Sequence, residues 1–197
     1  MIAVIDSGVA NLESVMAALR RINADAKLTA DANEIKNAER VILPGVGAAL
    51  PAMEQLKSKR LVEVIQKLTQ PVLGICLGMQ LLFERSTESG GTQCLGVLPG
   101  TIDRLPPSPD KPVPHMGWNQ LQIKNAQHPL LRGIANDSFV YFVHSFAAPV
   151  GDITLASTGY SATFSSSVAR DNFMGCQFHP ERSGAVGSQI LKNFMSL

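Results

Sequence analysis

Short apolar runs alternate with amphipathic segments in the first half of the chain. The runs are rich in branched aliphatic side chains, which are typical of buried strands, whereas the segments between them repeat apolar residues at helical spacing. The predicted strands cover residues 2–5, 26–29, 40–43 and 71–75, and the predicted helices cover residues 12–22, 31–38, 48–57, 60–68 and 77–83. Asn11 directly precedes the first helical stripe and is expected to cap that helix rather than to contact a ligand. This alternation predicts a mostly parallel sheet with helices on both faces.

The second half of the chain is mainly β. Its predicted strands cover residues 120–123, 139–143, 153–157, 163–169 and 173–178, and a helix closes the chain at residues 183–197. Because turns separate these short strands, we expect them to add antiparallel strands to the parallel sheet. The connecting residues 84–114 are rich in glycine and proline and are expected to be irregular loops outside the core. The expected fold class is α/β, in a single domain of residues 1–197.

Composition narrows the classes of function. The chain has 197 residues, of which 45% are hydrophobic, so one domain can bury a sizeable core. Its 17 basic and 16 acidic residues leave a net charge of +1, which gives no broad field to attract nucleic acid or an anionic membrane. Three cysteines without a C-x-x-C spacing favour neither a disulfide framework nor a zinc site. No apolar run reaches the ~18 residues of a membrane span, and we expect a cytoplasmic protein.

One cysteine occupies a position suited to a nucleophile. Cys76 falls where the apolar run of residues 71–75 gives way to helical spacing, and Gly74 and Gly78 flank it two residues away on either side. In such a G-x-C-x-G elbow, small neighbours allow a sharp turn, and the first amides of the following helix favour the thiolate. The alternative is a buried cysteine that ends a core strand, and this motif alone does not decide between the two.

A cysteine nucleophile needs an imidazole to accept its proton and a carboxylate to orient that imidazole. His179 follows the last predicted strand and precedes Pro180, and Glu181 comes two residues later. Alternation along an extended chain would put His179 and Glu181 on the same side. The other histidines are more simply explained as surface or packed residues: His115, His128 and His144. Together with Cys76, the H-P-E segment suggests a Cys-His-Glu triad.

Two segments resemble the class I, or triad, glutamine amidotransferases, which hydrolyse glutamine and pass ammonia to a synthase. They are G-I-C-L-G-M-Q at residues 74–80 and Q-F-H-P-E at residues 177–181, and the similarity extends over essentially the whole chain. Three further segments resemble the branch of this family that serves imidazole glycerol phosphate synthase in histidine biosynthesis. They are P-G-V-G at residues 44–47, P-H-M-G-W-N at residues 114–119 and Y-F-V-H-S at residues 141–145.

The resemblance implies a class I glutaminase-like fold and a role for each site residue. Cys76 would be the nucleophile, His179 the general base and acid, and Glu181 the group that orients His179. The positions that would bind L-glutamine or its oxyanion are Gly45, Val46, Gly47, Leu77, Gln80, Glu88, His144 and Ser145. Trp118 and Arg182 match positions near the mouth that faces the partner, which would be a (β/α)₈-barrel cyclase subunit in a heterodimer. The resemblance implies no metal and no organic cofactor.

Two other functions remain open at this point. The chain could serve a different synthase, such as one that makes anthranilate or pyridoxal phosphate, although the P-G-V-G and P-H-M-G-W-N segments argue against this. It could also be a non-catalytic scaffold with a triad-like fold. The presence of Cys76, His179 and Glu181 together disfavours a scaffold.

Overall fold

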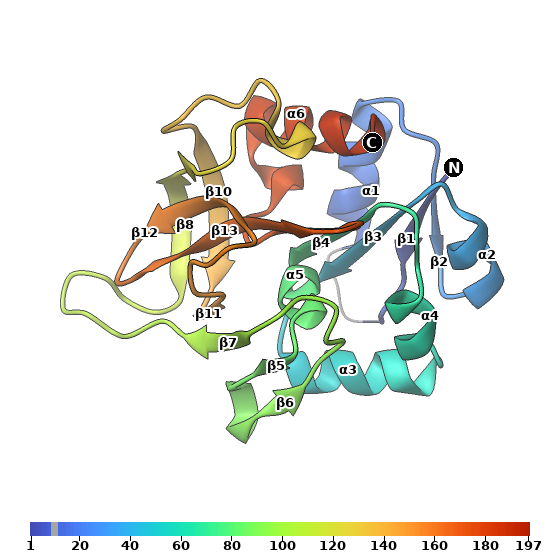
Figure 1. Ribbon diagram of the computed structural model, residues 1–197, viewed down its shortest axis with the longest axis horizontal. Helices are drawn as coiled ribbons and strands as arrows, with labels where there is room; N and C mark the ends of the chain where they lie inside the picture. The colour runs from blue at the N-terminus through green and yellow to red at the C-terminus, as the bar shows by residue number, and fades with distance from the viewer. Residues whose placement is uncertain (9–11) are drawn as a thin grey trace.

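The computed structural model describes residues 1–8 and 12–197, so the predicted cap at Asn11 lies outside the described residues. Its largest sheet runs through the middle of the molecule (Figure 1) in the order β2-β1-β3-β4-β14-β13-β12-β9. The parallel part consists of β2 (Ala26–Thr29), β1 (Ile2–Ile5), β3 (Arg40–Gly45), β4 (Val72–Cys76) and β14 (Phe173–Cys176). The antiparallel part consists of β13 (Thr163–Arg170), β12 (Thr154–Gly159) and β9 (Gln122–Ile123). The prediction of a mostly parallel sheet with added antiparallel strands is confirmed.

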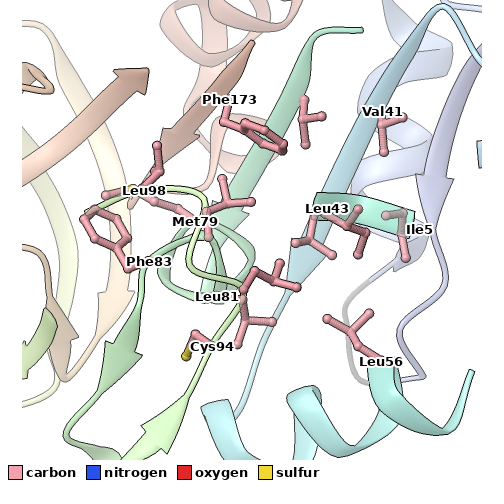
Figure 2. Packing of buried hydrophobic residues seen from close by; sticks show 14 of the residues in the cluster. Ile5, Val41, Leu43, Leu56, Met79, Leu81, Phe83, Cys94, Leu98 and Phe173 are labelled. Atoms are coloured by element: carbon pink, nitrogen blue, oxygen red, sulfur yellow. The ribbon is translucent and has the colours of Figure 1, made fainter. Parts of the chain in front are cut away.

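Helices cover both faces of this sheet (Figure 1). One face carries α1 (Leu12–Arg21) and α6 (Gly184–Met195), and the other carries α2 (Ala32–Asn37), α3 (Ala49–Ser58), α4 (Val62–Gln66) and α5 (Leu77–Leu82). Side chains alternate between the faces, so that Val41 and Leu43 of β3 join one core while Ile42 joins the other. Figure 2 shows Leu43 on the same side as Leu56 of α3. Within the described residues, no helix has the length and apolarity needed to cross a bilayer.

Residues 84–114 contribute to the core, so the expectation that they lie outside it is wrong. The strands β5 (Arg85–Ser86), β6 (Thr92–Gln93) and β7 (Thr101–Arg104) join β11 (Phe146–Ala147) in a small sheet, and the 3₁₀ helix η1 (Glu88–Gly90) lies between β5 and β6 in the chain. Leu95 and Leu98 are buried in this segment, and Figure 2 shows Leu98 within the core. Their backbone N–H groups donate to the carbonyls of Leu81 and Leu82, each at 2.9 Å, which satisfies the end of α5. Glycine and proline mark the turns here, but apolar side chains between those turns still face inward.

A separate antiparallel pair contains β8 (His115–Gln120) and β10 (Phe139–His144), joined through a connection that includes the 3₁₀ helix η2 (Pro129–Leu131). The sequence predicted β10 but missed β8, which precedes the strand expected at residues 120–123. Alternation along β8 buries His115 and leaves Met116 and Trp118 exposed by 63% and 55%. The strand therefore has one face toward the protein interior and one toward solvent.

Candidate active site

Cys76 lies at the corner where β4 ends and α5 begins. Its φ of 53° and ψ of −111° fall outside the conformations that residues with side chains ordinarily adopt. Two glycines make this corner possible. A Cβ on Gly74 would approach the backbone of α5 to 2.6 Å, and a Cβ on Gly78 would lie 1.7 Å from the carbonyl oxygen of Leu43. The corner turns the Cys76 side chain toward β10, where Sγ lies 3.7 Å from the carbonyl oxygen of Val143.

His179 and Glu181 form a buried pair that also belongs to this site. Nδ1 of His179 lies 2.8 Å from Oε1 of Glu181, and their side chains are only 9% and 3% exposed. From the sequence we expected strand alternation to bring His179 and Glu181 together, but the contact arises in another way. β14 ends at Cys176, and the 3₁₀ helix η3 (Pro180–Arg182) brings Glu181 to the imidazole. Within the described residues, the second carboxylate oxygen of Glu181 is buried without a hydrogen-bond partner.

The pKa of His179 is raised from its ordinary value of 6.5 to about 10. Burial lowers it, but hydrogen-bonding and charge interactions with Cys76 and Glu181 outweigh that effect. The ring is therefore protonated at neutral pH. Because Nδ1–H is donated to Glu181, the proton on Nε2 remains available to Cys76 or to a leaving group.

Cys76 and His179 line one cavity of about 240 Å³. Sites for drug-sized ligands are larger, at ~300–1,000 Å³, so this volume suits a molecule of amino-acid size. The predicted substrate-binding residues in its wall are Val46, Gly47, Leu77, Gln80, Glu88, His144 and Ser145. The wall is completed by Pro114, Val143 and Phe146; of these, Phe146 was expected from the sequence to contact a substrate through its backbone. Gly45 instead lines a small adjacent space together with Glu181.

Gly45 allows the end of β3 to approach the start of α5. A Cβ there would lie 2.9 Å from the amide nitrogen of Gly78 and 3.0 Å from Cβ of Leu77. This close packing puts the first residues of α5, whose free amides include that of Leu77, beside Gly45. The amide belongs to the first turn of α5, where N–H groups have no partner within their own helix. Gly47 has a φ of 90°, a conformation that favours glycine.

Two buried amides connect the Cys76 corner to β11. Nε2 of Gln80 donates one hydrogen to the carbonyl oxygen of Phe146 at 2.9 Å and the other to Oε1 of Gln177 at 3.0 Å. Nε2 of Gln177 in turn lies 3.8 Å from Sγ of Cys76. Because both hydrogens of its Nε2 are engaged, Gln80 can meet a substrate only through Oε1, as an acceptor.

Glu88 contacts the helix that follows the glycine segment. Its Oε2 accepts a hydrogen bond of 2.6 Å from the amide of Ala49 at the start of α3. The residue before it, Ala48, has no side chain that could cap this helix. Because Glu88 also lines the cavity, the same carboxylate supports the helix start and faces the space for a substrate.

The predicted interface residues lie together on the surface. The rings of Trp118 and Tyr141 are 5.9 Å apart between centroids, and the guanidinium carbon of Arg182 is 5.8 Å from the centroid of Tyr141. These three residues line a surface hollow of about 410 Å³. Tyr141 was not singled out from the sequence, although it begins the Y-F-V-H-S segment.

Gln177 was also missed as an individual residue. It is the first residue of Q-F-H-P-E, two positions before His179, so the signal was present in the motif. Its contact with Sγ of Cys76 becomes visible only when β14 and β4 are placed side by side. Among the described residues, no group of three or more His, Cys, Asp or Glu side chains could hold a metal ion.

Solved structures share the fold. A crystal structure of a glutamine amidotransferase has a TM-score of 0.76 at 16% identity and covers 99% of this chain and 97% of that chain. The structure of PurLQS from Thermotoga maritima has a TM-score of 0.70 at 19% identity, again covering 99% and 97%. At such identities the likeness establishes the fold alone, which is that of the class I glutamine amidotransferases.

Sequence comparison defines the family. The family model "Glutamine amidotransferase class-I" matches residues 3–197, and the chain belongs to this family, as predicted. Imidazole glycerol phosphate synthase subunit HisH of Shewanella loihica is 52% identical, covering 98% of this chain and 89% of that protein. HisH of Yersinia pseudotuberculosis is 45% identical and covers 100% and 99%. Within the family, the chain groups with these HisH subunits.

Proposed function

We propose that this protein is the glutaminase subunit of an imidazole glycerol phosphate synthase and hydrolyses L-glutamine to L-glutamate and ammonia. The observation that carries the proposal is the meeting of Cys76 and His179 in one cavity, with Glu181 bonded to the far side of the imidazole. The size of this cavity and the polar residues in its wall suit glutamine. The names of the HisH relatives favour this synthase over the rival synthases considered above.

The reaction begins at sulfur. In this scheme the proton of Cys76 resides on His179, and the sulfur attacks the amide carbon of glutamine and forms a tetrahedral oxyanion. The carbon–nitrogen bond then breaks as His179 gives its Nε2 proton to the nitrogen, which leaves as ammonia. A thioester remains on Cys76. His179, now neutral, takes a proton from water as that water attacks the thioester. The carbon–sulfur bond then breaks, its electron pair returns to the sulfur of Cys76 beside protonated His179, and glutamate departs.

Backbone amides stabilise the oxyanion in this scheme. The N–H of Leu77 is one donor, and an N–H from residues 45–47 is the other. Donors of this kind are typically worth about 3 kcal/mol each. Gln80 accepts a hydrogen bond from the substrate through Oε1, while Glu88, His144 and Ser145 complete the recognition of glutamine.

A second subunit receives the ammonia. We infer a (β/α)₈-barrel cyclase that docks on the surface around Trp118, Tyr141 and Arg182, where exposed aromatic and cationic side chains of the kind favoured at interfaces gather. The expected compartment is the cytoplasm, where three unpaired cysteines stay reduced.

The test is removal of the nucleophile in the assembled synthase. Cys76→Ala should lower glutamine hydrolysis by about three orders of magnitude or more, while synthesis supported by added ammonia continues. Cys94→Ser is the matched control, because Cys94 is buried away from the cavity and its thiol contacts the carbonyl of Thr92. Glutamate production by Cys76→Ala at a rate comparable to wild type would disprove the assignment.

A further inference from the structure

We propose that Asn119 and His115 are positioning residues that keep His144 neutral and in a single tautomer in the wall of the glutamine cavity. The expected effect on catalysis rests on the proposed glutaminase function. The hydrogen-bond arrangement and the protonation of the two histidines do not depend on it. Four groups carry it: the amide of Asn119, the rings of His115 and His144, and the carbonyl of Phe146. We refer to them as the histidine relay.

The direction of the relay follows from its last acceptor. Nδ1 of His144 lies 2.9 Å from the carbonyl oxygen of Phe146, and a carbonyl only accepts, so Nδ1 carries a proton. In a neutral ring Nε2 of His144 must then accept. Nδ1 of His115, at 3.0 Å, is the donor. This leaves Nε2 of His115 to accept from Nδ2 of Asn119 at 3.3 Å.

Asn119 cannot turn its amide around without loss. Its Oδ1 accepts from the backbone N–H of Gln120 at 2.8 Å, and its Nδ2 also donates to the carbonyl oxygen of Gly159 at 3.0 Å. The donor end therefore stays directed at His115. As a result, every bond of the relay points the same way, from β8 toward Phe146.

The surroundings favour neutral rings. His115 is stacked between Phe142 and Tyr160, with ring centroids 4.8 and 4.0 Å away. Burial, and then the charge of Lys111, lower the pKa of His115 to about 4. Burial also lowers the pKa of His144 to about 3; the bond to the Phe146 carbonyl opposes this, and the nearby His115 and His179 add to it.

A charged His144 would disturb the catalytic pair. The charged groups that face it are the His179 imidazolium, with its partners Cys76 and Glu181, and more distantly Lys111. A second cation in the same wall would repel the proton on His179 and weaken its pairing with the thiolate. The relay therefore separates two neighbouring histidines into one neutral wall residue and one charged catalytic residue.

The same carbonyl joins the relay to the nucleophile. Phe146 accepts from His144 and also from Nε2 of Gln80, and Gln80 holds Gln177 against Cys76. A change in the tautomer of His144 would therefore present a lone pair to a carbonyl oxygen and loosen the amide contacts beside sulfur.

The first test measures the tautomers of His115 and His144 directly and does not depend on enzyme activity. Long-range proton–nitrogen NMR spectra of the full chain, with labelled histidine, distinguish the two neutral tautomers from the cation. At pH 7 both His115 and His144 should be neutral with the proton on Nδ1. Finding either ring protonated on Nε2, or cationic, would overturn the proposal whatever the enzyme's activity.

The second test reverses the first donor of the relay. Asn119→Asp offers an acceptor to His115, which can be met if the histidine pair takes up a proton or if both tautomers reverse. Reversal would leave a lone pair of His144 facing the carbonyl oxygen of Phe146, so we expect the pair to take up a proton. The acidic limb of the kcat/KM profile for glutamine in the complex should move to higher pH by about one unit, a tenfold loss where that limb governs the rate. Asn119→Leu, which removes the bond without adding a charge, should lower kcat/KM without moving the limb. If the acidic limbs of the kcat/KM profiles of Asn119→Asp and Asn119→Leu fell at the same pH, the proposed role of the histidine relay would be contradicted.

Discussion

At the scale of single residues, the proposed catalysis depends on the carboxylate of Glu181. Oε1 of Glu181 binds His179, and Oε2 has no partner among the described residues, so the buried charge of Glu181 is directed to the imidazole. A buried charge held in this way stabilises the imidazolium and fixes which nitrogen faces the substrate. Its effect on the rate must therefore act through His179.

We expect His179→Ala to lower kcat for glutamine hydrolysis by about 10²–10⁴. Glu181→Gln should lower it less, because the base remains in place though less well oriented. The double variant should lose little more than His179→Ala alone. Steady-state kinetics of the three variants in the complex would measure this, and losses that multiply would argue that the two residues act independently.

The buried histidines predict sensitivity to acid. Unfolded histidine titrates near ~6.5, whereas burial lowers the pKa of His115 to about 4 and that of His144 to about 3. Between these values the unfolded chain binds more protons than the native one, so the free energy of unfolding falls as pH drops from about 6.5 toward about 4. Urea denaturation at a series of pH values would measure the fall. His144→Gln should make it shallower, and an unchanged slope would contradict the assignment.

At the scale of elements, the site depends on how tightly α5 packs against β3. Gly78→Ala would force a Cβ to within 1.7 Å of the carbonyl of Leu43, so the helix or the strand must move. We expect a loss of about 1–3 kcal/mol in the free energy of unfolding, with a larger relative loss of glutaminase activity because the corner at Cys76 shifts. Gly151→Ala is the control, since no atom lies within 4 Å of its added Cβ. Equal stability of the two variants would refute this account.

Periodicity predicted the elements with a clear apolar pattern. The strands of the parallel sheet and the helices on its faces were found because each shows one face or one stripe of apolar residues. β8 was missed because His115 and Asn119 fill its inward positions with polar groups, whose partners include His144 and the carbonyl of Gly159 on other elements. The helix predicted over residues 60–68 is shorter because Arg60 adopts a φ of 56°, which ends the helical path after α3.

The site residues also divide into those that the sequence predicted and those that it did not. Cys76, His179 and Glu181 could be named from their motifs because chemistry restricts which residue types can occur there. The contacts around them could not, since they join segments that are far apart in the sequence: Gln177, just after β14, contacts Cys76, and Glu88 of η1 contacts Ala49 at the start of α3. Such contacts require the strand order, which a single sequence does not specify.

At the scale of the whole molecule, the exposed face of the β8 and β10 pair supports a docked state. Met116, Trp118 and Phe139 are each more than half exposed, with relative exposures of 63%, 55% and 54%. Exposed hydrophobic side chains gathered on one surface are typical of an interaction site. The cavity with Cys76 lies behind this surface, because His144 and Val143 of β10 belong to its wall.

We predict that the isolated chain is a poor glutaminase and becomes active when its cyclase partner and that partner's nucleotide ligand are bound. Glycines on both sides of Val46 let the peptide between Gly45 and Val46 rotate at low cost, so its N–H can be withdrawn from the oxyanion at rest. Loss of one such donor costs about 10²–10³ in kcat. Glutaminase rates measured with and without partner and nucleotide would test this, and equal rates in all conditions would refute it while leaving the triad assignment intact.

The position of β14 has a consequence for how the protein is made. It lies between β4 and β13, although it follows both along the chain, and it leads directly into His179 and Glu181. While a ribosome is still synthesising the chain, Cys76 emerges about a hundred residues before its base, and β4 has an unpaired edge on that side. On the proposed triad, a nascent or interrupted chain that stops between β4 and β14 therefore has the nucleophile without its activating histidine. We therefore expect such unfinished chains to release no ammonia from the cellular glutamine pool before a complete protein exists.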